Sequence, residues 1–179
     1  MLYTRKGDNG KTGTFGCNQK ISKSSNITEA LGCLDEINSY MGVVKSRVTS
    51  YKVLNENAED IINRVQNNLF IIQAQVAGAD KNILENEVKN VEEIINNIEK
   101  ELPPIKSFLI SGMNDISASF DFARTVARRA ERRVVGVHEE GIAKIDTETL
   151  VYLNRLSSLL YALARYAANE EGVEVAPKY

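Results

Sequence analysis

The 179-residue chain has few of the side chains that bind transition metals or act as strong nucleophiles. It contains two cysteines, Cys17 and Cys33, and one histidine, His138. We expect no structural zinc, because a tetrahedral Cys/His site needs three or four protein ligands. His138 falls near the end of a helical pattern, where a helix-terminal cation is favoured over a catalytic base. A Ser-His-Asp or Cys-His arrangement is therefore not supported.

The sequence also lacks long apolar runs and an excess of positive charge. No window approaches the roughly 20 apolar residues of a membrane span, and the first residues lack the apolar core of a signal peptide. The formal net charge of -2 offers nothing for non-specific nucleic-acid binding. We therefore expect a single cytoplasmic domain with reduced thiols, no nucleic-acid partner and no membrane partner.

What is present is helical periodicity. After the first two dozen residues, apolar side chains recur at steps of three and four in five segments. The segments run through Leu31 to Val44, Ile61 to Val76, Leu84 to Leu102, Asp115 to His138, and Asp146 to Ala167. Ser24 or Ser25 suits the start of the first helix, Pro103-Pro104 stops the third, and Thr147 suits the start of the fifth. The fourth pattern runs through Phe122, Val126, Ala130 and Val134.

These segments predict an all-α fold, a five-helix bundle with a glycine-rich N-terminal loop. The expected division is an arm over 1–23, the bundle over 24–171 and a tail over 172–179. Only Phe108-Leu109-Ile110 resembles a short strand.

The N-terminal segment carries a glycine at every third position: Gly7, Gly10, Gly13 and Gly16. Gly10-Lys11-Thr12 resembles part of a phosphate-binding P-loop. However, the first glycine of that motif would fall on Arg5, and no hydrophobic strand precedes it. The capacity to bind phosphate remains, since small residues expose backbone N–H groups while Lys, Arg and Thr add donors. The alternative is an unstructured N-terminal arm.

The densest charge cluster is Ala123 to Arg133, with five arginines and one glutamate. Helical geometry places Arg124, Arg128 and Glu131 on one stripe beside the apolar arc. One interpretation is a solvated face with an ordinary Arg128–Glu131 pair. The other is a partly desolvated row of donors for phosphate or carboxylate. Asn154, on a stripe with Leu150, Ser157 and Tyr161, is either a bundle amide or a ligand contact.

Four segments together resemble the PduO-type family of ATP:cob(I)alamin adenosyltransferases. They are Thr4-Arg5-Lys6-Gly7-Asp8-Asn9-Gly10, Ala30 to Asn38, Ala123 to Arg133, and Tyr152-Leu153-Asn154-Arg155-Leu156-Ser157. They follow the family's order and span the chain. One departure is Ser111-Gly112-Met113-Asn114, where the family usually has a Pro-Gly-Gly turn.

The resemblance implies a homotrimer that binds ATP and a corrinoid at subunit interfaces. Asp35 would pair with Arg124 between subunits, and Phe108 would keep the lower corrin face free of a ligand. With Arg128, these residues form the expected catalytic set. The implied ATP contacts are Thr4, Arg5, Lys6, Gly7, Thr12, Gly13, Lys23, Arg128, Glu131, Arg132 and Asn154.

In the implied reaction, reduced cobalt attacks the 5′ carbon of ATP and triphosphate leaves. Because the cobalt is the nucleophile, the protein supplies binding and orientation rather than a base. We expect Mg²⁺ to arrive with the nucleotide and no metal site built by the protein. Possible partners are a reductase and an adenosylcobalamin-dependent enzyme. The alternatives are a helical module that senses ATP or delivers the cofactor, and a phosphotransferase that uses the same arginines.

Overall fold

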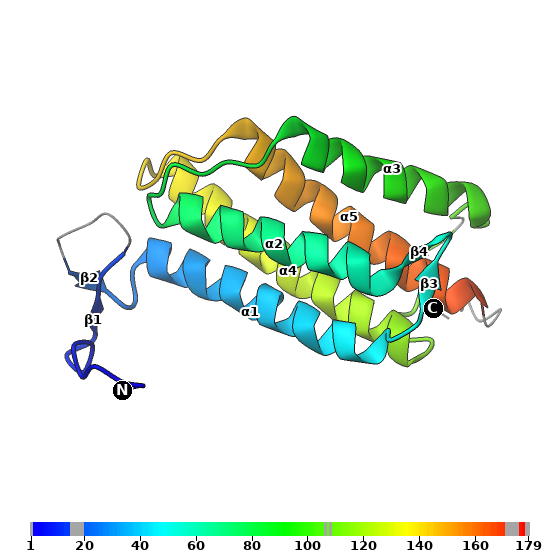
Figure 1. The fold of residues 1–179 in the computed structure, drawn as a ribbon, viewed down its shortest axis with the longest axis horizontal. Coiled ribbons are helices and arrows are strands. Elements are labelled where there is room, and N and C mark those ends of the chain that lie inside the picture. Colours follow the sequence, from blue (N-terminus) through cyan, green and yellow to red (C-terminus); the bar gives the residue numbers. More distant parts are fainter. Residues whose placement is uncertain (1, 15–19, 106, 108, 171–175, 178–179) are drawn as a thin grey trace.

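Five long helices dominate the computed structural model, which describes residues 2–14, 20–105, 107, 109–170 and 176–177. The helices are α1 (Asn26–Arg47), α2 (Ala58–Val76), α3 (Glu85–Glu101), α4 (Asp115–Glu139) and α5 (Thr147–Glu170). Two antiparallel strand pairs of two residues each accompany them: β1 (Lys11–Thr12) with β2 (Ile21–Ser22), and β3 (Lys52–Val53) with β4 (Glu56–Asn57). Figure 1 shows the helices side by side, with β1 and β2 beyond the start of α1.

The helix ends follow local sequence chemistry. Ser25 is the N-cap residue of α1, although its side chain makes no capping hydrogen bond. The side chain of Asn114 caps α4 by accepting a hydrogen bond from the Ser117 amide. The last residue of α3 comes two positions before Pro103, whose ring cannot continue a helix.

Helix α4 runs antiparallel to both α1 and α5. Asn26 at the start of α1 donates to Glu140 just after α4, and Arg47 at the end of α1 donates to Ser119. On the other side of α4, Asn114 donates to the Ala167 carbonyl near the end of α5. Helix α4 therefore lies between α1 and α5, and its polar side chains reach both neighbours.

The apolar faces of the helices form one core. Its largest fully buried side chains include Tyr152, Phe120, Leu34 and Ile37. The Tyr152 hydroxyl accepts a hydrogen bond from the Asn68 side chain, which also donates to Glu87 on α3. Because Tyr152 is fully enclosed, burial raises its pKa to about 12.

The five-helix prediction is confirmed, with two corrections to the apolar pattern. Phe122 is 54% exposed and packs its ring against Tyr40 at the surface, so it does not belong to the core arc. Leu84 is the N-cap of α3 and is also exposed, so the heptad of that helix begins at Val88. Phe122 lies at the edge of the apolar face of α4, whereas Leu84 lies just before the first turn of α3.

Phe108-Leu109-Ile110, the best short strand pattern in the sequence, forms no strand at its described residues Leu109 and Ile110, in agreement with the all-α prediction. Phe108 lies outside the described residues. The strands instead form inside the arm and in the turn between α1 and α2. Within the part of the chain that the structure describes, no helix is long and apolar enough to cross a membrane.

Candidate functional site

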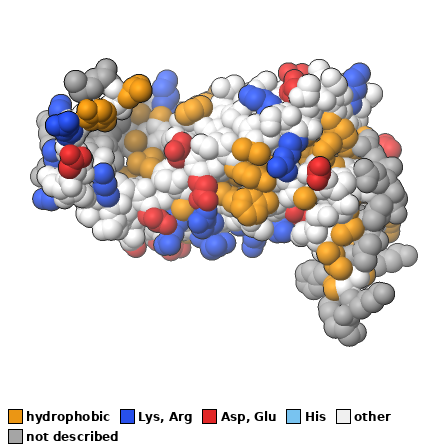
Figure 2. Space-filling view, turned by 90° about the horizontal axis from the view of Figure 1, so that it is seen from below, with side chains coloured by type: hydrophobic (Ala, Val, Ile, Leu, Met, Phe, Trp, Pro, Cys, Tyr) orange, Lys and Arg blue, Asp and Glu red, His pale blue; other side chains and the backbone are white. Residues whose placement is uncertain are grey.

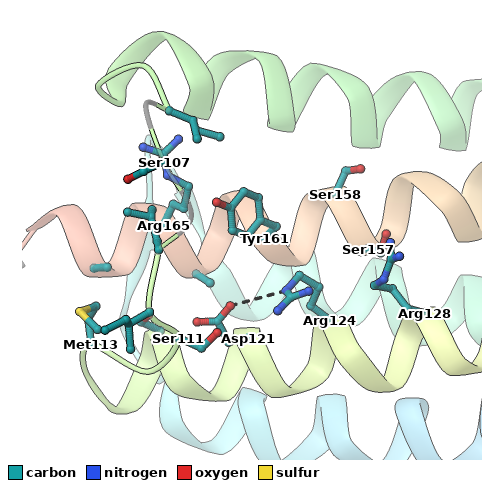
Figure 3. A pocket seen from close by; sticks show the side chains of 16 residues that line it. Ser107, Ser111, Met113, Asp121, Arg124, Arg128, Ser157, Ser158, Tyr161 and Arg165 are labelled. Carbon is teal, nitrogen blue, oxygen red and sulfur yellow. Dashed lines mark ion pairs between the residues drawn. The ribbon is translucent and has the colours of Figure 1, made fainter. Parts of the chain in front are cut away.

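A cavity of about 640 Å³ opens between α4, α5 and the segment that joins α3 to α4. Helix α4 contributes Ser117, Asp121, Arg124 and Arg128, and α5 contributes hydroxyls, alanines and Arg165. The joining segment supplies an apolar wall that includes Leu109, Ile110 and Met113. Figure 3 shows the arginines of α4 on one side and Arg165 on the other, with Tyr161 between them. The cavity therefore presents cationic and hydroxyl donors opposite apolar side chains.

Arg124 is the most enclosed of the arginines that the sequence placed on the stripe. Its side chain is 26% exposed, and its Nε lies 3.6 Å from Oδ1 of Asp121 one turn earlier on α4. The guanidinium carbon lies 5.9 Å from the centre of the Tyr161 ring, within cation–π range. Nε is buried without a hydrogen-bond partner among the described residues. The prediction of a partly desolvated arginine holds for this position.

Arg128 lines the same cavity one turn further along α4, but its side chain is exposed. Glu131, on the same stripe, accepts a hydrogen bond from the Asn154 amide of α5 at 3.0 Å. Asn154 in turn accepts one from Arg155, which pairs with Glu92 on α3. Arg128, Glu131 and Asn154, three of the predicted nucleotide contacts, therefore lie together on the facing sides of two helices. Arg132 is exposed on α4.

The N-terminal arm is a compact cationic loop. Lys23 donates its backbone N–H to the Gly10 carbonyl, and its Nζ lies 3.0 Å from the point where a Cβ on Gly7 would be. Gly10 has a φ of +73°, a conformation that glycine adopts without strain. The described part of the arm carries five cations against the single carboxylate of Asp8: Arg5, Lys6, Lys11, Lys20 and Lys23. Thr4, Thr12 and Gly13 belong to the same loop, so the predicted arm contacts are grouped together.

Arg124 and Arg128, the cavity-lining arginines of α4, are called the arginine row below. The arm lies far from this row within one chain. The Asn26–Glu140 contact puts the base of the arm at the far end of α4, twelve residues beyond Arg128. Twelve helical residues span about 18 Å. Among the described residues, no hydrogen bond or ion pair joins the arm to Arg128, Glu131, Arg132 or Asn154. The structure thus brings together each half of the predicted nucleotide site, but not the two halves.

Two further predicted site residues do not pair within one chain. Asp35 is exposed on α1, while Arg124 faces Asp121 in its own helix. The proposed Asp35–Arg124 pair between subunits stays a prediction, as does the role of Phe108 outside the described residues. Cys33 is buried on α1, and burial raises the pKa of its thiol, which disfavours the reactive thiolate.

Sequence reasoning missed two charged residues of the cavity, Asp121 and Arg165. Both are almost fully buried, at 9% and 7% exposure. The sequence did contain a signal for Asp121, because a carboxylate three residues before Arg124 on a helix can pair with it. Arg165 stands alone among apolar residues of α5, a position where a charged side chain needs a partner.

The fold and site define a class: an all-α bundle with an interhelical cavity that offers arginines and hydroxyls to an anionic, partly apolar ligand. A family model described as cobalamin adenosyltransferase matches residues 2–167. The chain belongs to the cobalamin adenosyltransferase family.

Relatives and solved structures agree with this assignment. The chain is 34% identical over 171 residues to the corrinoid adenosyltransferase PduO of Citrobacter freundii, covering 92% of this chain and 49% of that protein. It is 31% identical over 176 residues to a corrinoid adenosyltransferase of Bacillus subtilis, covering 96% and 89%. A variant PduO-type ATP:corrinoid adenosyltransferase from Lactobacillus reuteri, solved with cobalamin and ATP, superimposes with a TM-score of 0.89 at 29% identity and full coverage of both chains. The chain spans about half the length of the PduO relatives.

Proposed function

We propose that this chain transfers the 5′-deoxyadenosyl group of ATP to the cobalt of a reduced corrinoid. The cobalt(I) centre supplies both electrons of the new cobalt–carbon bond. The bond between the 5′ carbon and its oxygen breaks, and triphosphate leaves with the bonding pair. The observation that carries this proposal is the arginine row of α4 beside an interhelical cavity, in a chain of this family.

The cavity suits the corrinoid half of the reaction. Its apolar wall and alanines can pack against a flat macrocycle, while its hydroxyls and guanidinium groups can donate hydrogen bonds to peripheral amides. Because the substrate itself provides the nucleophile, the protein's part is to hold cobalt and carbon in line and to exclude other ligands. Phe108 remains our candidate for covering the lower corrin face.

The exposed cations suit the triphosphate half. Arg128 and Arg132 offer planar donors for phosphate oxygens, and the arm adds Lys6, Lys23 and backbone N–H groups. Negative charge grows on the triphosphate as the bond breaks, so cations fixed around it lower the barrier. We expect Mg²⁺ to be held mainly by phosphate oxygens and water.

We further propose that a second copy of the chain completes each nucleotide site within a homotrimer. The support is the separation of the arm from the arginine row, together with Asp35, which is exposed and forms no hydrogen bond or ion pair with the described residues of its own chain. Figure 2 shows exposed hydrophobic side chains gathered on the face that includes α1, with lysines and arginines beside them. The exposed large hydrophobic residues of the chain include Val43 of α1 and Phe122 of α4. A cytoplasmic location and the named protein partners stay predictions.

Identification of the products is the decisive experiment. The purified chain is mixed with ATP, Mg²⁺ and chemically reduced cobalamin, and the products are separated by chromatography. We expect an adenosylated corrinoid and triphosphate in equal amounts. Release of ADP would instead support the phosphotransferase, and binding of ATP without any product would support the sensor or delivery module.

A further inference from the structure

The segment between α3 and α4 forms one wall of the cavity and is held to the bundle near both of its ends. The holding groups are the two buried charged side chains of the cavity, Arg165 of α5 and Asp121 of α4. The cationic Arg165 donates to a backbone carbonyl, and the anionic Asp121 accepts from a backbone amide. Figure 3 shows them on separate sides of the cavity, next to the segment.

Arg165 holds the beginning of the segment. Its Nη2 donates a hydrogen bond to the Pro103 carbonyl at 2.9 Å, just after the end of α3. A carbonyl in this position follows a helix end and cannot receive an intrahelical bond. A charged donor to a carbonyl makes a stronger hydrogen bond than a neutral one, and the burial of Arg165 excludes competing water.

Asp121 holds the end of the segment. Its Oδ2 accepts a hydrogen bond from the Gly112 amide at 3.1 Å, while Oδ1 faces Arg124. Gly112 has a φ of +86°, which turns the chain back toward α4. Asn114 adds a third attachment by donating to the Ala167 carbonyl. The described apolar residues of the wall, Ile105, Leu109 and Ile110, therefore lie between an attachment to α5 and an attachment to α4.

We propose that Arg165 and Asp121 are positioning residues that hold this wall at the distance the corrinoid requires. The proposal rests on the adenosyltransferase function proposed above and assigns these residues to its corrinoid half. Neither residue needs to contact the nucleotide, because both act through the backbone at Pro103 and Gly112. Asp121 also connects the wall to Arg124, so one carboxylate fixes both an apolar side and a cationic side of the cavity.

The test compares Arg165→Met, Arg165→Lys and Asp121→Asn with the wild type. Methionine keeps an apolar stem without a donor, lysine keeps one cationic donor, and asparagine keeps an oxygen acceptor without the charge. Arg64→Met is the matched control, since Arg64 is also paired, with Glu56, but does not line this cavity. The readouts are hydrogen exchange of the peptide covering 107–114, the corrinoid KM, the turnover rate and the ATP dissociation constant.

We expect Arg165→Met to speed exchange of the 107–114 peptide and to raise the corrinoid KM about tenfold, with ATP affinity unchanged within about twofold. Arg165→Lys should recover most of the loss, and Asp121→Asn should fall between wild type and Arg165→Met. Arg64→Met should leave the exchange and the KM at wild-type values.

Unchanged exchange of the peptide in both Arg165→Met and Asp121→Asn would overturn the proposal, as would a loss of ATP affinity equal to the change in corrinoid KM. If Arg165→Met does not fold, Asp121→Asn carries the comparison, and unchanged exchange in that variant would overturn the proposal. Hydrogen exchange does not depend on turnover. Faster exchange in a chain whose wild type forms no adenosylated corrinoid would therefore support the positioning role and reject the proposed reaction.

Discussion

Arg128 is the side chain whose removal should separate catalysis from folding. It lines the cavity yet is exposed, so the core does not depend on it. Arg128→Ala should lower adenosyl transfer by about two orders of magnitude and weaken ATP binding, because a donor to the departing triphosphate is lost. The helical circular-dichroism spectrum should stay unchanged.

The control is Arg133→Ala, on the other flank of the same helix, where the side chain faces Glu29 at 3.7 Å. Its activity should match the wild type, since exposed ion pairs contribute little to stability. Equal turnover in both variants would remove Arg128 from the site.

Tyr152 gives a pH signature of the core. The folded pKa of about 12 lies above the ordinary value of 10, so the fold favours the neutral phenol. Burial of the neutral phenol therefore contributes to the free energy of unfolding in full below pH 10. This contribution falls by about 1.4 kcal/mol per pH unit as the pH rises from 10 toward 12. Relative to Tyr152→Phe, the wild type should therefore lose stability between pH 10 and 12.

Urea unfolding of both proteins at pH 8, 10 and 11 measures this difference. Subtracting the variant removes the titration of the other tyrosines and lysines, which both proteins share. A constant difference from pH 8 to 11 would mean that the phenol is not buried as described.

At the scale of elements, the features that could be predicted from the sequence are those set by apolar periodicity and by helix-stopping residues. Five helices, their order and most of their core positions followed from apolar spacing, and Pro103 marked the end of α3. The spacing could not show which arc faces which neighbour, so Phe122 was misplaced at the edge of a face. Two-residue strands leave no period to detect, which is why β1 to β4 were missed.

Site residues could be predicted where a motif concentrates charge. They could not be predicted where a single charged residue binds the backbone of a segment distant in sequence. The motifs singled out Arg124 and Arg128, which line the cavity. They also singled out Glu131 and Asn154, whose contact with the nucleotide stays a prediction. The roles of Asp121 and Arg165 depend on backbone groups of a distant segment, and no local pattern encodes that contact. The chain departs from the family at Ser111-Gly112-Met113-Asn114, yet Gly112 provides a positive φ and Asn114 a helix cap.

That cap makes a prediction about α4. Asn114 accepts from the Ser117 amide and donates to the Ala167 carbonyl, so Asn114→Ala should lower the free energy of unfolding by about 2 kcal/mol. Asn57 is the N-cap of α2 but makes no capping hydrogen bond with its side chain. Asn57→Ala should therefore cost less than about 1 kcal/mol. Equal losses in urea unfolding would show that the Asn114 contacts do not stabilise α4.

At the scale of the whole molecule, assembly should depend on the face that α1 and α4 share. Phe122 is 54% exposed and contacts Tyr40, so Phe122→Ala should weaken the proposed trimer more than it weakens the monomer. Phe70 on α2 is 61% exposed and serves as the control. Light scattering across a dilution series should show dissociation of Phe122→Ala at higher concentration than Phe70→Ala. Identical dissociation of the two variants would place the interface elsewhere.

The distance between the arm and the arginine row has a genetic consequence. If every site takes its arm from one chain and its arginines from the next, two inactive alleles can rescue each other. Lys6→Ala damages only the arm and Arg128→Ala only the row, so a mixed ring contains some interfaces in which both contributions are intact. Random co-assembly in equal amounts gives about one quarter of the wild-type sites. Co-expression of the two variants should thus restore about a quarter of the activity, whereas a site built within one chain would restore none.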